Sequence, residues 1–383
     1  MNPVRAGVLL SALALPHRVD AGGAGKDGWV TETSSPTKGT VNDPKDAPVL
    51  AGCGAIEASL VVVAGELASV LATKGELPDA QEIEWRQRRA GNPHVWPRTW
   101  GAHVSGTLDR KVLAADVTKW LGANGKRARC GVATVRTNNK EAIAVVAVEP
   151  VADLAPIPTT AKVGTWLDLD ATLLSGSAGR VVLLAPTGAP KTILSSMSGP
   201  HVKARFYVAK AGRHVVQVLA EDGLGPRPVL EAEIYVGVDP PNAPPSSAVP
   251  GEEAGDGLAD PSDALLKRLN GARTAEGIAT LSLDAGLSKL ARAHADLMMK
   301  AKLLGHDVGD GDPASRVSDA GLKWKLVGEN VAKAKTELAA HRAIYASPSH
   351  RSNVLDGRFK KVGLGIALDP KTGYLWIAEL FGG

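Results

Sequence analysis

Near its carboxyl end the sequence reads SPSHRSNVL at residues 347–355. Four further strings stand in the same third of the chain: ARAHADLM at 291–298, GH at 305–306, VGENV at 327–331 and VGLG at 362–365. Apolar residues recur at spacings of three and four through the first of these, which indicates an amphipathic helix. Two strand-like runs at 362–368 and 374–381 flank a turn sequence and indicate a closing hairpin. The segment therefore reads as an α+β domain with its helices first.

In this order and at these separations, the five strings resemble the bacterial, SCP-like branch of the CAP superfamily. Members of that superfamily include cysteine-rich secretory proteins, antigen 5 and plant pathogenesis-related proteins. The resemblance covers residues 263–383, and its specificity comes from the five strings together, since each alone is a weak signal. It implies an α-β-α sandwich with a cavity on one face, in which the family gathers His and Glu side chains.

Carried over by position, the resemblance implies that His306, Glu329 and His350 line this cavity. Two imidazoles and one carboxylate can bind Zn²⁺ or a similar divalent ion and leave positions open for water. A divalent metal such as zinc is therefore one expected cofactor. The three residues are separated by 23 and 21 positions, which is no local metal motif, so only the fold can bring them together.

Asn330 and Glu379 are two further residues expected in the cleft. Asn330 directly follows Glu329, and Glu379 stands in the last strand where relatives often carry Gln. The sequence also departs from the family pattern. The second Glu of many eukaryotic members has no clear match, and Ile344 stands where a Trp is common six residues before the His.

The candidate residues also have purely structural interpretations. Glu329 and His306 stand near predicted helix ends and can act as caps there, and His350 stands at the start of a predicted helix. His294 lies on the apolar face of its helix, which favours a packing role. His341 lies on a polar helical face, which predicts a solvated side chain.

Three functional classes remain open. The first is an exported CAP-domain protein whose cleft binds a divalent metal or a small or lipid-like ligand, with cell-envelope material among the ligands that the family suggests. The second is a metal-dependent hydrolase that acts outside the cytoplasm, where the ion would lower the pKa of bound water. The third is a structural or adhesion protein with an inert cleft. A serine hydrolase is not expected, because neither Ser347 nor Ser349 stands in a Gly-x-Ser-x-Gly elbow.

Residues 239–262 carry six prolines and precede the last segment. Proline is excluded from helix interiors and central strands, which predicts an extended linker. Upstream of it, residues 156–238 alternate apolar and polar side chains in short runs separated by turn signals, which predicts a β-sandwich. The pattern resembles an immunoglobulin-like accessory domain, with His201 and His214 expected at the surface.

Residues 50–155 repeat features of the last segment. A hairpin-like run at 129–148 parallels the closing hairpin, and a helix-like run at 57–68 parallels 284–295, with Leu67 at the place of His294. We expect either a degenerate CAP-like copy that keeps the scaffold and lacks the site, or an unrelated α+β domain. The two cysteines of the chain, Cys53 and Cys130, fall here. They are expected either to pair, as is usual in exported proteins, or to be two buried thiols.

The first residues read as a targeting segment. Arg5, an apolar stretch and the small residues Ala21 and Gly22 fit a secretory signal peptide at 1–21, which predicts a secreted, periplasmic or cell-envelope protein. The alternative is an unstructured extension. Residues 22–49 are rich in Gly, Thr, Pro and Asp and are expected to be flexible. A net charge of +4 and 4% aromatic residues argue against a nucleic-acid partner, and no apolar run reaches the about 18–20 residues of a membrane span.

Overall fold

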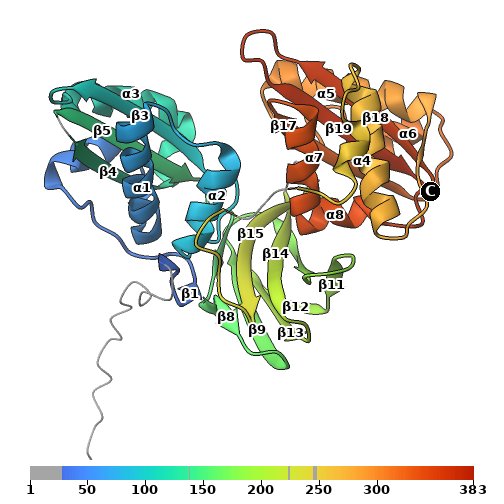
Figure 1. Cartoon of the computed structure of the whole chain (residues 1–383), viewed down its shortest axis with the longest axis horizontal. Coiled ribbons are helices and arrows are strands. Elements are labelled where there is room, and N and C mark those ends of the chain that lie inside the picture. The colour runs from blue at the N-terminus through green and yellow to red at the C-terminus, as the bar shows by residue number, and fades with distance from the viewer. Residues whose placement is uncertain (1–27, 138, 223–224, 245–247) are drawn as a thin grey trace, which may run out of the picture.

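The computed structural model describes residues 28–383, except residue 138 and the segments 223–224 and 245–247. The predicted signal peptide at 1–21 lies outside the described residues. The described chain forms an N-terminal α+β domain, a β-sandwich and a C-terminal α+β domain, with the sandwich between the other two in the sequence (Figure 1). No helix of this part of the chain is long and apolar enough to cross a membrane.

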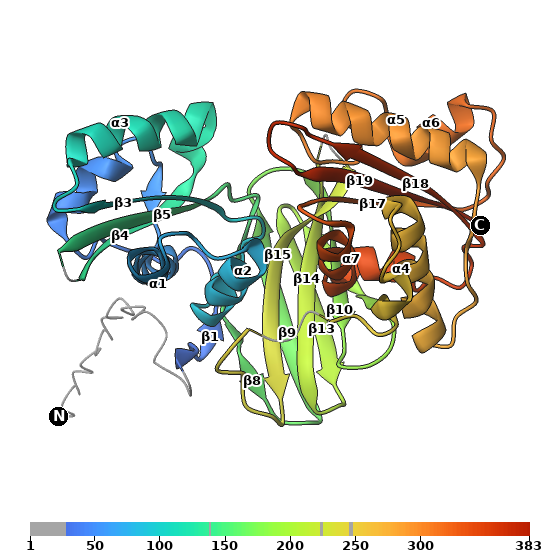
Figure 2. The ribbon, with the colours of Figure 1, turned by 45° about the horizontal axis from the view of Figure 1, so that its top comes forward.

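The C-terminal domain is built on one four-stranded sheet. Its strands are β16 (Ser282–Leu283), β17 (Val327–Ala334), β18 (Lys361–Leu368) and β19 (Leu375–Gly382), in the order β16-β18-β19-β17. One face is covered by α5 (Ala285–Ala301) and α6 (Pro313–Asp319), and the other by α4 (Pro261–Ala275), α7 (Glu337–Ala346) and α8 (Pro348–Val354) (Figure 2). The expected α-β-α sandwich is confirmed.

Sequence features determine how α5 packs on this sheet. Asp284 caps the helix, since its carboxylate accepts a hydrogen bond from the Leu287 amide at 2.9 Å. Gly363 and Gly365 lie on β18 directly against the helix. A Cβ at either position would come within 2.1 Å of a backbone carbon of Leu287 or Ala291. Only glycine permits this close approach.

The opposite face of the C-terminal domain is fastened by one buried arginine. Arg273 of α4 is fully buried, and its Nε donates to the Ala279 carbonyl at 2.7 Å. Its Nη1 donates to the carbonyls of Val354 at 2.7 Å and Asp356 at 3.1 Å. These bonds tie α4 to the chain that follows α8 and leave the guanidinium with partners although it is buried.

The N-terminal domain has the same sheet order and the same strand directions. Its strands are β2 (Ala55–Ile56), β3 (Arg98–Ser105), β4 (Arg129–Thr137) and β5 (Lys140–Val148), in the order β2-β4-β5-β3. In both domains the shortest strand is parallel to its neighbour and the other pairs are antiparallel. Helix α1 (Ala58–Lys74) is the counterpart of α5. A Cβ on Gly131 would meet its Leu60 backbone at 2.1 Å, as Gly363 would meet α5.

The rest of the N-terminal domain covers the two faces of its sheet. Helix α1 packs on one face, with α2 (Ala80–Arg89) beside it, and α3 (Arg110–Leu121) packs on the other with the 3-10 helix Pro44–Leu50. A second 3-10 helix, Gly122–Arg127, follows α3. Cys53 and Cys130 form a disulfide with their Cα atoms 6.4 Å apart, and the Cys130 end is fully buried on β4. The expected pairing is therefore confirmed.

The middle segment forms two sheets around one apolar core. The first has the order β11-β10-β14-β15-β8 and the second β12-β13-β9-β6. Their strands are β6 (Ala152–Leu154), β8 (Thr160–Ala161), β9 (Thr165–Leu173), β10 (Ser177–Leu184), β11 (Lys191–Ile193), β12 (Ser195–Ser198), β13 (His201–Val208), β14 (Gly212–Asp222) and β15 (Gly225–Val236). The two-sheet arrangement follows from the alternation of apolar residues, while the immunoglobulin-like description stays a prediction.

The expectation of a flexible segment at 22–49 is wrong for residues 28–49; residues 22–27 lie outside the described chain. Strand β1 (Glu32–Thr33) pairs with β7 (Ile157–Pro158), next to the sandwich. Trp29 is 1% exposed, and its ring stacks edge-on against Tyr235 at a centroid distance of 5.1 Å. Burial of this one large side chain outweighs the loop-like composition around it.

The linker prediction at 239–262 also needs correction in its second half. Val249 is buried in the core of the C-terminal domain, and Glu252 forms an ion pair with Arg342 of α7. Pro261, which was assigned to the linker, is the first residue of α4, and Asp260 caps that helix. Proline is favoured at this position because the first helical residues have no N–H partner within the helix.

Candidate functional site

The carboxylate of Glu329 on β17 lies at the centre of the candidate site. Its Oε1 lies 3.0 Å from Nδ1 of His306, and its Oε2 accepts a hydrogen bond from Nη2 of Arg316. The Glu329 side chain is buried, whereas the His306 side chain is 14% exposed. The fold thus brings together Glu329 and His306, which the resemblance placed in one cavity although they are 23 residues apart.

Arg316 of α6 was not among the predicted residues, yet it organises the site. Its Nη1 donates to the carbonyls of His306 and Gly311, each at 2.7 Å. Asp312 caps α6 by accepting hydrogen bonds from the amides of Ala314 and Ser315. The arginine therefore fastens the loop that carries His306 while its charge balances that of Glu329.

His294 of α5 is fully buried, as its position on the apolar face predicted, but it is also part of the polar site. Its Nδ1 lies 2.8 Å from a carboxylate oxygen of Asp310, and its Nε2 lies 2.9 Å from the Gly305 carbonyl and 3.8 Å from Glu329 Oε1. The carboxylate and the carbonyl are both hydrogen-bond acceptors, so each contact is a hydrogen bond where the ring nitrogen that faces it donates. Asp310, in the loop before α6, is thus a partner in the site.

His350 reaches the site from α8. Burial, together with the nearby charge of His306, lowers the pKa of His350 to about 3, so this ring is neutral at physiological pH. Neither of its ring nitrogens has a hydrogen-bond partner among the described residues, and the same holds for Nε2 of His306. The start of α8 is held by the sandwich, because the Ser349 amide donates to Gln217 Oε1 of β14 at 3.1 Å.

The three predicted metal ligands do not fit a site with three protein ligands. Both oxygens of Glu329 are engaged, one by His306 and the other by Arg316, whose guanidinium would repel a cation. Within the described part of the chain, no group of three or more His, Cys, Asp or Glu side chains is arranged to hold a metal ion. Of the three predicted ligands, His306 and His350 have ring nitrogens without a hydrogen-bond partner among the described residues, and Glu329 contacts the other nitrogen of His306.

Asn330 and Glu379 do not share a cleft with Glu329, which corrects our expectation. Successive residues of a strand point to opposite faces of the sheet. Asn330 therefore faces away from α5. On that opposite side its Nδ2 donates to Glu379 Oε2 at 3.0 Å, and its Oδ1 accepts from Nδ2 of Asn353 at 3.0 Å. Both residues are fully buried, and burial raises the pKa of Glu379 to about 7.

The sheet registers identify which N-terminal residues occupy the corresponding places. Glu329 pairs with Leu380, and Thr99 pairs with Val146 at the same point of the N-terminal sheet. By the same registers Val145 stands at the place of Glu379. Glu57 precedes α1 as Asp284 precedes α5, which puts Leu67 at the place of His294. At these three places the N-terminal domain therefore has Thr99, Val145 and Leu67, where the C-terminal domain has Glu329, Glu379 and His294.

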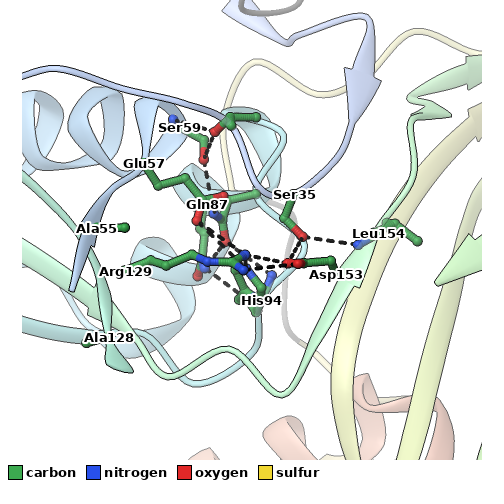
Figure 3. Close-up of polar contacts among 12 residues, drawn as sticks. Ser35, Ala55, Glu57, Ser59, Gln87, His94, Ala128, Arg129, Asp153 and Leu154 are labelled. Carbon is green, nitrogen blue, oxygen red and sulfur yellow. Dashed lines mark hydrogen bonds and ion pairs between the residues drawn. The ribbon is translucent and has the colours of Figure 1, made fainter. Parts of the chain in front are cut away.

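The N-terminal domain has a different buried polar cluster, which the sequence interpretation missed (Figure 3). Arg129 forms a bidentate ion pair with Asp153 of the sandwich, with Nη2 3.1 Å from Oδ2. Glu57 lies beside them, with Oε2 3.8 Å from His94 Nε2 and 3.9 Å from Arg129 Nη1. Burial raises the pKa of Glu57 to about 7, against the opposing charge of Arg129. These contacts join the N-terminal domain to the sandwich.

Two histidines expected in solvent are buried instead. His341 of α7 is fully buried and has no hydrogen-bond partner among the described residues, and burial lowers its pKa to about 4. It is covered because the segment after residue 248 packs on α7, where Glu252 meets Arg342. His214 is 2% exposed on β14. His201, by contrast, is exposed as predicted.

The C-terminal domain is thus a three-layer α-β-α domain with a Glu-His-Arg site at the edge strand of its sheet. Comparisons with known proteins concern this domain. Residues 266–380 match CAP, the cysteine-rich secretory protein family. The uncharacterized protein YkwD of Bacillus subtilis (strain 168) is 31% identical over 120 residues. That match covers 31% of this chain and 46% of YkwD, so the chain spans about half the length of that relative. The chain therefore carries a domain of the CAP superfamily, which confirms the resemblance.

Two solved structures are also similar. An outer surface protein from Borrelia burgdorferi has a TM-score of 0.31 at 19% identity, covering 32% of this chain and 92% of that one. An extracellular protein containing an SCP domain from Bacillus anthracis str. Ames has a TM-score of 0.30 at 14% identity, covering 61% of this chain and 85% of that one. Because both scores lie below 0.5, the family assignment rests on the sequence matches.

Proposed function

We propose that the protein is an exported binding protein, and that its CAP domain takes its ligand at the rim formed by His306 and His350. One observation carries the proposal: these two imidazoles have ring nitrogens without hydrogen-bond partners among the described residues, next to a carboxylate that orients one of them. The Cys53–Cys130 disulfide supports export, because such bonds persist in oxidising compartments.

The Glu329 contact gives His306 a defined orientation. With Nδ1 directed at the carboxylate, Nε2 of the neutral ring is left as an acceptor that points away from Glu329. A carboxylate behind an imidazole in this way sets the tautomer and the orientation of the ring, as it does behind metal-binding histidines. The pair can therefore receive a divalent ion or the donor group of a small or lipid-like ligand. Zinc, if bound, would be held by these two rings and by water.

Zinc titration of the full chain tests this proposal. Isothermal titration calorimetry with zinc chloride should detect one ion per chain, and either His306→Ala or His350→Ala should weaken binding by more than about tenfold. His201→Ala removes an exposed imidazole of the sandwich and is the matched control, which should bind like wild type. Wild-type binding that both rim variants retain would exclude this rim. No binding by the wild type would restrict the proposal to a non-metal ligand, for which phospholipid vesicles are the next probe.

Neither alternative class is favoured by the site. A hydrolase needs a free general base, and the carboxylate of Glu329 is already paired with Arg316. An inert cleft would give no role to Nε2 of His306 and the ring nitrogens of His350, which have no hydrogen-bond partner in the described part of the chain. We also propose that the N-terminal domain is a degenerate CAP-like copy and that the sandwich is an immunoglobulin-like accessory domain. The identical sheet order and the matching Gly131 and Gly363 contacts support the first of these.

A further inference from the structure

The sandwich exposes an ordered strip of side chains on the outer face of β9 and β13. Three cross-strand pairs follow one another there, and they are Trp166 with Tyr207, Asp168 with Arg205 and Asp170 with Lys203. The residues between them, such as Leu167 and Phe206, point into the core. All six side chains of the strip are therefore on one face, as the alternation of a strand requires.

The aromatic pair is the unusual part of this strip. The chain has 15 aromatic residues in all, and several of the tryptophans are almost fully buried. Trp166 and Tyr207 are 57% and 46% exposed, yet their ring centroids are only 5.3 Å apart, with the planes tilted by 46°. The guanidinium of Arg205 lies 5.6 Å from the Trp166 ring centroid. Two large rings held side by side in solvent form a surface with apolar faces that folding does not use.

The charges along the strip are paired. Lys203 Nζ lies 3.1 Å from Asp170 Oδ2, and Arg205 Nε lies 3.5 Å from Asp168 Oδ1. The next pair along the strands adds a hydroxyl and an imidazole, since Thr172 Oγ1 lies 3.1 Å from His201 Nδ1. The strip is thus electrically balanced and presents donors and acceptors in alternation. A polyanion would need an excess of Lys and Arg, and the strip has none.

We propose that this strip binds a neutral polysaccharide. The apolar C–H faces of pyranose rings pack on the Trp166 and Tyr207 rings, and the sugar hydroxyl groups, which both donate and accept, exchange hydrogen bonds with the paired side chains of Asp168, Arg205, Asp170 and Lys203. The strip runs along two extended strands, about 3.3 Å per residue, so it suits a linear chain better than a single compact molecule. This surface is separate from the CAP-domain rim and does not depend on the function proposed for that rim.

Co-sedimentation of the full chain with insoluble chitin and cellulose, two neutral polysaccharides, tests the proposal. We expect saturable binding to at least one of these polymers. Trp166→Ala should weaken it by about tenfold or more, which corresponds to about 1.4 kcal/mol, and Tyr207→Ala by a smaller factor. Trp96→Ala is the matched control, because it removes another exposed tryptophan, 45% exposed, that lies in the N-terminal domain. Circular dichroism confirms that each variant is folded.

Four results would overturn the proposal. The first is an absence of wild-type binding to both polymers, and the second is binding that Trp166→Ala retains in full. The third is a concentration-dependent dimer, detected by light scattering, that Trp166→Ala abolishes, because the strip would then be a contact between copies of the chain. The fourth is binding to an acidic polymer such as heparin that high salt removes, because charge attraction and not ring stacking would then hold the polymer.

Discussion

The two α+β domains of this chain share one scaffold and differ in what they build on it. Both have a four-stranded sheet of the same order, and in both a glycine on the strand next to the short parallel one lets a long helix approach the sheet. The C-terminal domain adds His294 and Glu329, where the N-terminal domain has Leu67 and Thr99. The fold therefore does not require the site, and a few side chains decide whether it is present.

The two domains also differ in how they are fastened. The N-terminal domain has a disulfide that ends on β4, whereas the C-terminal domain uses the buried Arg273 to bind backbone carbonyls. Each domain buries a carboxyl group with a raised pKa, Glu57 in the first and Glu379 in the second. The following predictions use these differences, and hydrogen exchange followed by mass spectrometry reports on each domain separately within the full chain.

Removal of the disulfide is expected to lower the free energy of unfolding most. The double variant Cys53→Ser, Cys130→Ser removes a cross-link between residues 77 positions apart, which chain-entropy arguments value at about 4–5 kcal/mol. Exchange protection of α1, β4 and β5 should fall strongly, while that of α5, β18 and β19 should stay as in the wild type. Equal loss in both domains would mean that they do not unfold independently.

Glu329→Gln is expected to lower the free energy of unfolding somewhat less. The substitution leaves Arg316 buried next to a neutral side chain, which typically costs about 3–4 kcal/mol. Chemical denaturation should show the loss in the C-terminal transition. Thr99→Ser, at the corresponding place of the N-terminal sheet, is the control and should change stability little. An unchanged Glu329→Gln protein would show that the Glu329–Arg316 pair does not form.

The raised carboxyl pKa values predict that stability falls as the pH rises. Ordinary ion-paired carboxylates have the opposite effect, because they lose stability as the pH falls. Glu57 and Glu379 hold a proton up to a pKa of about 7 in the folded chain, against 4.5 when unfolded. Their contribution is complete below pH 4.5 and is lost as the pH rises to about 7, by up to about 3 kcal/mol each. Glu57→Gln should reduce this dependence in the N-terminal domain only, and Glu379→Gln in the C-terminal domain only. If the domain that carries the substitution kept the full pH dependence of its stability, the raised pKa would not belong to that residue.

The smallest change in the free energy of unfolding is expected when the side chains of His294 and Leu67, which stand at corresponding places of the two domains, are exchanged. His294→Leu removes the hydrogen bonds to Asp310 and Gly305, and Leu67→His places an imidazole in an apolar core. Each change should destabilise its own domain by about 2 kcal/mol. Thermal unfolding of the two single variants checks this. A stabilised His294→Leu protein would mean that the polar contacts of His294 contribute nothing to the fold.

The sequence predicted the C-terminal domain well because its signals are local. Helix periodicity, the Gly-containing strand and the turn before β19 are readable from neighbouring residues, and the family resemblance located His306, Glu329 and His350. Arg316 and Asp310 were missed because no local pattern marks a residue that acts from a neighbouring element. Asn330 and Glu379 were misplaced because their side of the sheet depends on the strand register.

Burial by distant segments explains the remaining errors. His341 lies on a face that looks polar, but the chain after residue 248 covers it. Trp29 orders a segment whose composition resembles a linker, because it packs against Tyr235 more than 200 residues away. Such contacts join parts of the chain that no sequence window contains.

The tautomer of His306 tests the central claim most directly. In long-range nitrogen–proton correlation spectra of the full chain, above the pH range in which imidazoles protonate, His306→Gln identifies the His306 signals. The account predicts that the proton is on Nδ1, which faces Glu329 Oε1 at 3.0 Å, and that Nε2 is unprotonated. A His306 ring protonated on Nε2 would contradict the site.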